Sequence, residues 1–234
     1  MEKKTLGIVG GVGPLATMLL GEMIVRRTNA SKDQEHVDMV ITNNTKIPDR
    51  TAYVLDRTKP NPVTVMIKDI QRLTSIGAEI IAIPCNTAHS FYSEMQQASP
   101  VPILNMIEET VKRASEDGVK RLGILGTTGT ITAGVYQDAC KKAGIVPVVT
   151  DEGTQEKVMS IIYDYVKANK PADRRLWTEI EFYMVEQKCD KVILGCTELS
   201  IVREELNLQE LYLDSMLVLA EESILACGYE LNKK

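Results

Sequence analysis

The stretch LGIVGGVGPLAT at residues 6–17 returns later in the chain as LGILGTTGTITA at residues 122–133, and the fold prediction starts from this repeat. The two copies lie 116 positions apart and share one leucine, one isoleucine and three glycines in register. Each copy begins as a short apolar run and ends in a glycine-rich turn, which is typical of a strand that leads into a helix in a βαβ unit. We therefore predict a duplicated unit.

A second repeated pair contains a cysteine at the same place in each copy. IIAIPCNTAHS at residues 80–90 matches VILGCTELS at residues 192–200, which puts Cys85 and Cys196 at an offset of 111. Glycine-rich strand ends recur in βαβ proteins without any duplication, so the glycines alone are weak evidence for a repeat. Chance recurrence does not explain why a cysteine follows the equivalent strand in both copies. The two similar offsets indicate one duplicated unit with a small deletion.

Short β-branched runs alternate with amphipathic stretches, among them residues 88–97 and 132–143, which is the pattern of parallel sheets covered by helices. Pro171 stands at a plausible first position of another helix. We expect an α/β fold of two similar lobes, each a parallel sheet flanked by helices, related by a pseudo-twofold axis with a cleft between them. The first lobe is predicted to comprise residues 1–104 plus 214–234, and the second residues 105–213. No low-complexity linker separates the lobes, so they should pack against each other.

Composition argues against several classes of partner. The chain has 234 residues, with 27 basic and 32 acidic side chains and a formal net charge of -5, so no basic footprint for nucleic acid is expected. No apolar run approaches the roughly 18 residues that span a bilayer, and no signal peptide is evident, so we expect a cytoplasmic protein without membrane contact. Five cysteines without a CxxC, together with two histidines, argue against disulfides and against a metal site.

Ligands of open parallel sheets gather at the carboxyl ends of the strands. Residues 10–13, Asn43, Cys85, residues 126–130 and Cys196 all fall at such ends. If the two halves face each other, the two cysteines approach one cleft from opposite sides. Facing thiols suit proton transfer at a stereocentre, where a thiolate removes a proton from one face and a thiol returns one to the other face. This chemistry requires neither a metal nor a cofactor.

The pKa of such a thiol must be lowered toward neutrality, because a free cysteine has a pKa of about 8.5. A helix N-terminus lowers this pKa by only about one unit. Further hydrogen-bond donors are available in Asn86, Thr87 and His89 after Cys85, and in Thr197 after the second cysteine. Asn86 and Thr87 are also candidate helix N-caps. For His89 we favour a local hydrogen bond over catalysis.

Other candidates carry open interpretations. Glu198 is either an acid in the first turn of a helix or a partner for a substrate ammonium. Gly11, Gly13 and Ala16 match the G-x-G-x-x-A pattern of dinucleotide-binding folds, but the acidic residue expected after the second strand is replaced by Asn43. We therefore interpret the glycines as a backbone site for a small anion such as an α-carboxylate.

Seven motifs in order carry a family resemblance: GGVGPLAT, NNTKIPDRTAY, PCNTAH, MIEET, GTTGTITAGVY, YVKA and GCTELS. With them the sequence resembles the PLP-independent aspartate racemases of the aspartate/glutamate racemase superfamily. The resemblance implies two α/β lobes with the active site between them, usually in a homodimer. It also implies that Cys85 and Cys196 are the catalytic acid and base, and because both are present, that the reaction runs in both directions.

The resemblance further implies a substrate-binding set. Arg50 and Lys167 would meet a side-chain carboxylate, which suits a bidentate guanidinium and a mobile ammonium. The α-carboxylate and ammonium would be held by Asn86, Thr87, Thr127, Thr128, Thr130 and Thr197. The expected set is completed by Gly11, Val12, Asn43 and Glu198. Relatives often carry methionine at the position of Val12.

The leading hypothesis is a cofactor-independent aspartate racemase that acts on a dicarboxylic amino acid. Alternatives with the same cleft are a glutamate or broad-specificity racemase, a hydantoin racemase, and a maleate isomerase working through a cysteine adduct. Arg50 and Lys167 favour a dicarboxylic amino acid over a hydantoin. A non-catalytic protein that binds amino acids or senses nucleotides is a different class. A Cys–His hydrolase would leave Cys196 unexplained.

Overall fold

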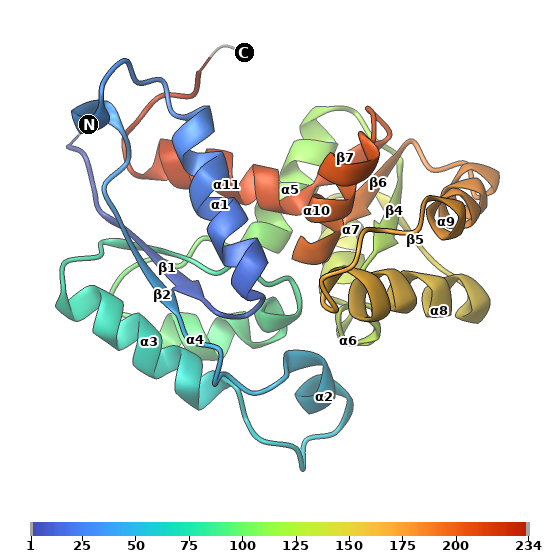
Figure 1. Ribbon diagram of the computed structural model, residues 1–234, viewed down its shortest axis with the longest axis horizontal. Coiled ribbons are helices and arrows are strands. Elements are labelled where there is room, and N and C mark those ends of the chain that lie inside the picture. Colours follow the sequence, from blue (N-terminus) through green and yellow to red (C-terminus); the bar gives the residue numbers. More distant parts are fainter. Residues whose placement is uncertain (1, 233–234) are drawn as a thin grey trace.

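The computed structural model describes residues 2–232 and contains two parallel β-sheets flanked by helices (Figure 1). The elements of the first half are β1 (Leu6–Gly10), α1 (Pro14–Arg27), η1 (Asp33–Glu35), β2 (Met39–Asn43), α2 (Arg50–Leu55), α3 (Val63–Ser75), β3 (Ile80–Ala82), η2 (Thr87–Phe91), α4 (Tyr92–Ala98) and α5 (Met106–Glu116). Those of the second half are β4 (Arg121–Leu125), α6 (Thr128–Ala133), α7 (Val135–Lys142), β5 (Val146–Val149), α8 (Glu152–Ser160), η3 (Ile161–Val166), α9 (Arg174–Glu186), β6 (Lys191–Leu194), α10 (Thr197–Leu206), β7 (Tyr212–Asp214) and α11 (Ser215–Ala226).

The two sheets repeat one strand order. The first is β2-β1-β3 and the second is β5-β4-β6-β7, with parallel pairing throughout. A parallel bridge between Ile81 and Ile103 stands in the first half where β7 pairs with β6 in the second. The repeated strands β1 and β4 are central and almost wholly buried, as apolar strands covered on both faces should be. The predicted α/β fold with two helix-flanked parallel sheets is confirmed.

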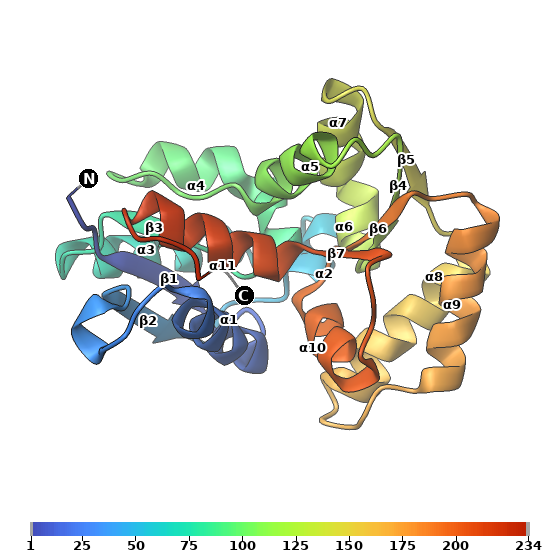
Figure 2. The same cartoon turned by 90° about the horizontal axis from the view of Figure 1, so that it is seen from above.

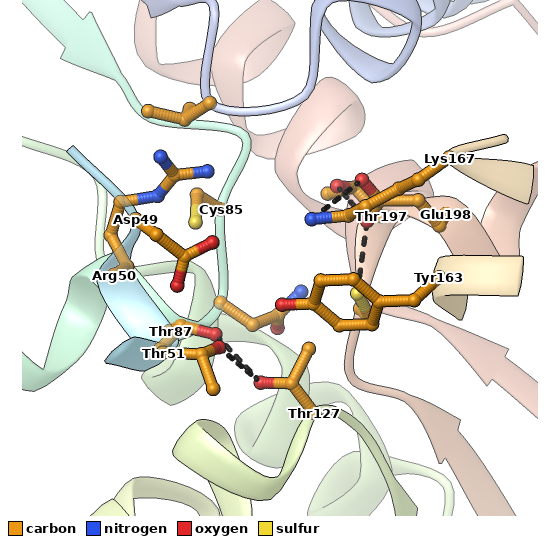
Figure 3. Close-up of a pocket in the computed structure, with 13 residues that line it drawn as sticks. Asp49, Arg50, Thr51, Cys85, Thr87, Thr127, Tyr163, Lys167, Thr197 and Glu198 are labelled. Atoms are coloured by element: carbon orange, nitrogen blue, oxygen red, sulfur yellow. Dashed lines mark hydrogen bonds and ion pairs between the residues drawn. The ribbon is translucent and has the colours of Figure 1, made fainter. Parts of the chain in front are cut away.

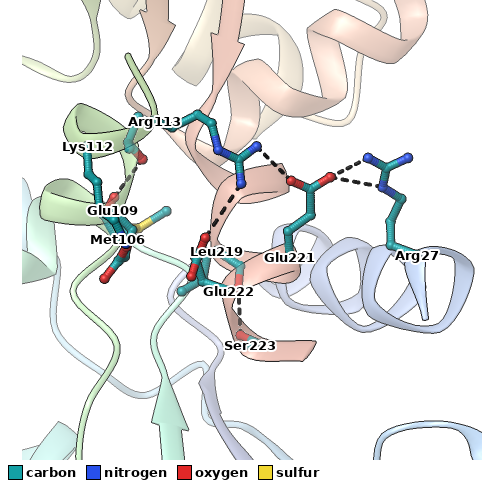
Figure 4. Close-up of polar contacts among 10 residues, drawn as sticks. Arg27, Met106, Glu109, Lys112, Arg113, Leu219, Glu221, Glu222 and Ser223 are labelled. Carbon is teal, nitrogen blue, oxygen red and sulfur yellow. Dashed lines mark hydrogen bonds and ion pairs between the residues drawn. The ribbon is translucent and has the colours of Figure 1, made fainter. Parts of the chain in front are cut away.

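Two helices connect the halves. Helix α11 follows the second sheet but packs along α1 and α5, while α5 follows the first sheet and also contacts α7 (Figure 2). Glu221 of α11 is 5% exposed and joins the three helices (Figure 4). Its carboxylate accepts hydrogen bonds from Arg27 of α1, whose Nε is 3.1 Å away, and from Arg113 of α5 at 2.9 Å. The proposed lobe boundaries at residues 105 and 214 stay a prediction.

Several expected helices differ in detail. The helix expected over 132–143 is two helices, because Gly134 adopts a left-handed conformation with φ of 71° between α6 and α7. The helix expected over 88–97 begins as the 3₁₀ turn η2 before α4. Pro171, expected at the first position of a helix, instead precedes α9, whose N-terminus is capped by Asp173. Among the described residues, no helix is long and apolar enough to cross a membrane.

Candidate active site

Cys85 and Cys196 line one pocket, although they follow strands of different sheets. Figure 3 shows this pocket, with Cys85 labelled. Cys85 follows β3 and Cys196 follows β6, the strands that occupy the same place in the two sheet orders. Their side chains are nearly buried, with 8% and 7% exposed. The pocket is small, since the centre of a water-sized sphere can occupy only about 20 Å³ of it.

The Cys85 side of the pocket carries a buried cation. Asp49 caps α2 by accepting a hydrogen bond from the Ala52 amide at 2.7 Å, and this fixes Arg50 as the first helical residue. Arg50 is 9% exposed and anchored by a hydrogen bond from Nη1 to the Pro48 carbonyl at 3.0 Å. Burial acts to lower the pKa of Arg50, but the neighbouring Cys85 sulfur acts in the opposite direction and the pKa is raised overall. Arg50 therefore places a guanidinium cation beside the Cys85 sulfur.

The Cys196 side carries a carboxylate instead. The Cys196 thiol donates to Oε2 of Glu198 at 2.9 Å, and Oε1 of Glu198 lies 3.6 Å from Nζ of Lys167. Burial and then the Glu198 charge raise the pKa of Cys196 well above its ordinary value, while Lys167 acts in the opposite direction. Cys196 therefore holds its proton, and the two sulfurs face partners of opposite charge.

Lys167 reaches the pocket from the end of an unusual helical turn. The segment η3, Ile161–Val166, is a π-helix that continues α8, and such turns are frequent at functional sites. It brings Tyr163 to the pocket wall together with Lys167, whose Nζ lies 4.5 Å from the centre of the Tyr163 ring. Figure 3 shows both side chains on the wall opposite Arg50 and Cys85.

Four threonine hydroxyls join the two halves beside the pocket. Thr87 lies 3.0 Å from Thr127 and 2.8 Å from Thr130, measured between hydroxyl oxygens. Thr51 donates to the Thr127 hydroxyl at 3.2 Å. Thr51 and Thr87 belong to the first half of the chain, whereas Thr127 and Thr130 belong to the second. The hydroxyl cluster therefore ties the halves together at the pocket.

Two buried donors on the pocket wall have no hydrogen-bond partner among the described residues. They are Nε of Arg50 and Nδ2 of Asn86, and Asn86 is only 2% exposed. Buried polar groups in native proteins are nearly always paired, so these donors indicate where acceptors of a ligand would lie. Arg50, Asn86 and Lys167 together make the pocket suitable for an anion with more than one acceptor group.

His89 lies behind the Cys85 turn and does not line the pocket. Its Nδ1 donates to the Cys85 carbonyl at 2.9 Å, and its Nε2 accepts from the Met106 amide at 3.3 Å. Burial lowers the pKa of His89, so the ring is neutral. This is the local hydrogen-bonding role that the sequence favoured.

The structure brings most, but not all, of the predicted site residues together. Those that line the pocket are Val12, Arg50, Cys85, Asn86, Thr87, Thr127, Lys167, Cys196, Thr197 and Glu198. Thr130 is buried behind Thr87, and Asn43 is exposed at the end of β2. Gly11 lines an adjoining cavity and its amide donates to Thr17 Oγ1 at 3.0 Å, while Thr128 lines a separate cavity.

Sequence reasoning missed three pocket residues, Asp49, Thr51 and Tyr163. Asp49 carried a signal, since an aspartate before a short helix is a standard N-cap. Asn86 was expected to cap the next helix, but its side chain makes no capping hydrogen bond because its Oδ1 accepts from Tyr136 instead. Within residues 2–232, no group of three or more His, Cys, Asp or Glu side chains could hold a metal ion.

Comparison with known proteins gives consistent similarities. The profile of the family described as Asp/Glu/Hydantoin racemase matches residues 9–223. The chain is 28% identical to the broad specificity amino-acid racemase RacX of Bacillus subtilis, over 94% of this chain and 96% of that protein. It superposes on the aspartate racemase of Picrophilus torridus with a TM-score of 0.84 and 32% identity, covering 98% of this chain and 96% of that one. It is 29% identical to the glutamate racemase of Aquifex aeolicus over 74% of this chain and 65% of that protein.

Proposed function

Since the chain belongs to the Asp/Glu/hydantoin racemase family, we propose that it interconverts L- and D-aspartate without a cofactor, by proton transfer between two cysteines. The observation that carries the proposal is that Cys85 and Cys196 line one pocket. Cys85 lies beside the cation of Arg50, whereas Cys196 lies beside the carboxylate of Glu198. A two-base mechanism needs one sulfur deprotonated and the other protonated before the substrate arrives. Arg50 beside Cys85 and Glu198 beside Cys196 supply that difference.

In the proposed reaction the Cys85 thiolate takes the α-proton of one enantiomer. The electron pair of the broken C–H bond moves into the α-carboxylate as an enediolate, and the Cys196 thiol then delivers its proton to the opposite face of the carbon. Cys196 is left as the thiolate and Cys85 as the thiol, so the reverse turnover restores the first state. Thiols are too weak to take an α-proton unaided, and the enediolate therefore depends on donors such as Asn86 Nδ2 and Thr197.

Aspartate fits the charges of the pocket. One carboxylate would accept from Asn86 and the threonine hydroxyls, and the other from Arg50 and Lys167. The similarity to the aspartate racemase of Picrophilus torridus supports this choice.

A glutamate or broad-specificity racemase is the second candidate. It is favoured by the similarity to RacX and by the cavity that adjoins the pocket and shares Arg50, Lys167 and Glu198 with it, because a longer side chain could extend there. Initial rates on aspartate and on glutamate, compared as kcat/KM, decide between the two substrates. A homodimer and a cytoplasmic location are further proposals, and sedimentation analysis tests the first.

The direct test uses purified protein without pyridoxal phosphate. L-Aspartate is incubated with the wild type and with the Cys85→Ser and Cys196→Ser variants, and both enantiomers are measured by chiral chromatography. The proposal requires D-aspartate from the wild type, and loss of turnover with retained aspartate binding in each variant. Aspartate binding with no turnover of either aspartate or glutamate in the wild type would instead identify an amino-acid-binding protein.

A further inference from the structure

Tyr136 lies outside the proposed catalytic machinery, although it ends the GTTGTITAGVY motif. It sits on α7 in the second half of the chain and its side chain is fully buried. The Tyr136 hydroxyl donates to Oδ1 of Asn86 in the first half at 2.6 Å. Asn86 follows Cys85 directly, so this bond crosses between the halves at the first cysteine turn.

The same side chain also touches the second cysteine turn. A Cβ placed on Gly195 would lie 3.1 Å from Cε2 of Tyr136 and 2.8 Å from the Leu125 carbonyl oxygen, so the ring packs directly against the backbone there. Gly195 immediately precedes Cys196. One rigid phenol therefore stands between the residue after Cys85 and the residue before Cys196.

The hydrogen bond decides how the Asn86 amide is oriented. Because Oδ1 accepts from Tyr136, the amide points Nδ2 in another direction. Within residues 2–232 this buried nitrogen has no hydrogen-bond partner, and Asn86 lines the pocket. Burial raises the pKa of Tyr136, so its hydroxyl stays protonated and continues to donate. The side chain of Asn86 makes no capping hydrogen bond to η2, so among the described residues its hydrogen bond with Tyr136 is the contact that orients it.

We propose that Tyr136 is a positioning residue, which aims the Asn86 amide donor at the substrate and holds the two cysteine turns at their working separation. The identity of the acceptor as an α-carboxylate rests on the proposed function. If Tyr136 only filled the core, its burial would be explained, but removing its hydroxyl group would not change turnover.

The experiment compares Tyr136→Phe with Tyr212→Phe in the full chain. Both changes remove one buried hydroxyl and keep the ring, and Tyr212, whose hydroxyl donates to Glu181 at 2.8 Å, does not line the pocket. Leaving a buried acceptor unpaired should lower kcat/KM of Tyr136→Phe for aspartate by about 10-fold or more. Tyr212→Phe should lose comparable stability, measured as Tm, with unchanged kcat/KM.

Crystal structures of the wild type and of Tyr136→Phe make the test independent of activity. The expected result is a rotated Asn86 amide and a changed separation between Cys85 and Cys196. An unchanged amide and separation, or equal kcat/KM in the wild type and Tyr136→Phe, overturns the role of Tyr136. A wild type without turnover of aspartate or glutamate refutes the proposed function instead, and the two crystal structures still decide whether Tyr136 orients Asn86.

Discussion

Replacing Glu198 by glutamine should change the proton affinity of Cys196 with little change in shape. The carboxylate oxygen lies 2.9 Å from the sulfur, and its charge is one of the causes that raise the pKa of Cys196. Coulomb's law at that separation gives about 1.4 kcal/mol at the dielectric constant of water and about 5.7 kcal/mol at an effective value of 20. Removing this charge should therefore lower the pKa of Cys196 in Glu198→Gln.

The assay is the pH dependence of kcat/KM for aspartate racemisation. Because the equilibrium constant between enantiomers is one, both directions must give the same profile, and its limbs report the cysteine pair as a unit. In the proposed mechanism the active enzyme has one thiolate and one thiol, so the alkaline limb marks loss of the proton that Cys196 holds. A lower pKa of Cys196 must therefore move the alkaline limb to lower pH by at least about one unit, with a smaller effect on the acid limb.

Asp49→Asn is the matched control. It removes another carboxylate from the pocket wall and keeps a good helix cap, but Asp49 is not among the causes of the Cys196 shift. Its alkaline limb should stay where the wild type has it. An alkaline limb that is equally unmoved in Glu198→Gln would refute the reasoning and would leave Glu198 only a role in substrate binding.

Three further predictions concern the scaffold. Glu221→Gln removes the charge that pairs with Arg27 and Arg113, both of which are about a third exposed. The free energy of unfolding in urea should fall by about 2 kcal/mol. An unchanged urea midpoint would contradict the bridging role of Glu221. Thr87→Val removes the two hydrogen bonds that join Thr87 to Thr127 and Thr130, and we expect the free energy of unfolding in urea to fall by about 1–3 kcal/mol and KM to rise. Full stability would show that the cluster does not tie the halves. Cys140→Ala should keep kcat/KM, since burial raises the pKa of this thiol to about 11 and it lies outside the pocket; lost turnover in a folded variant would contradict this.

Much of the architecture was accessible from sequence because its physical cause is local. Apolar runs that end in glycine turns predict buried parallel strands, and a repeated cysteine predicts equivalent strand ends. The short strands β5 and β7 were not singled out, because β5 contains Pro147 and leaves Val146 exposed at the sheet edge, where the apolar signal is weak.

From the residues alone, the two cysteines and the donors beside them were predictable, because their residue types indicate the chemistry. Arg50, Lys167 and Thr127 were expected only from the family resemblance. Tyr163 was not predicted, because the π-helical turn that places it beside Lys167 arises from a shifted backbone hydrogen-bond pattern. No residue type in the sequence marks such a turn. The hydrogen bond from Tyr136 to Asn86 escaped because it joins the two halves of the chain, and such a pairing depends on how the halves pack.

The most direct test of the two-cysteine account is racemisation of L-aspartate in heavy water without pyridoxal phosphate, sampled at low conversion. With a separate proton donor on each face, D-aspartate should carry solvent deuterium at Cα while the recovered L-aspartate carries almost none. Deuterium in both enantiomers from the earliest samples would indicate a single base, and D-aspartate formed without deuterium would contradict proton transfer from Cys196 altogether.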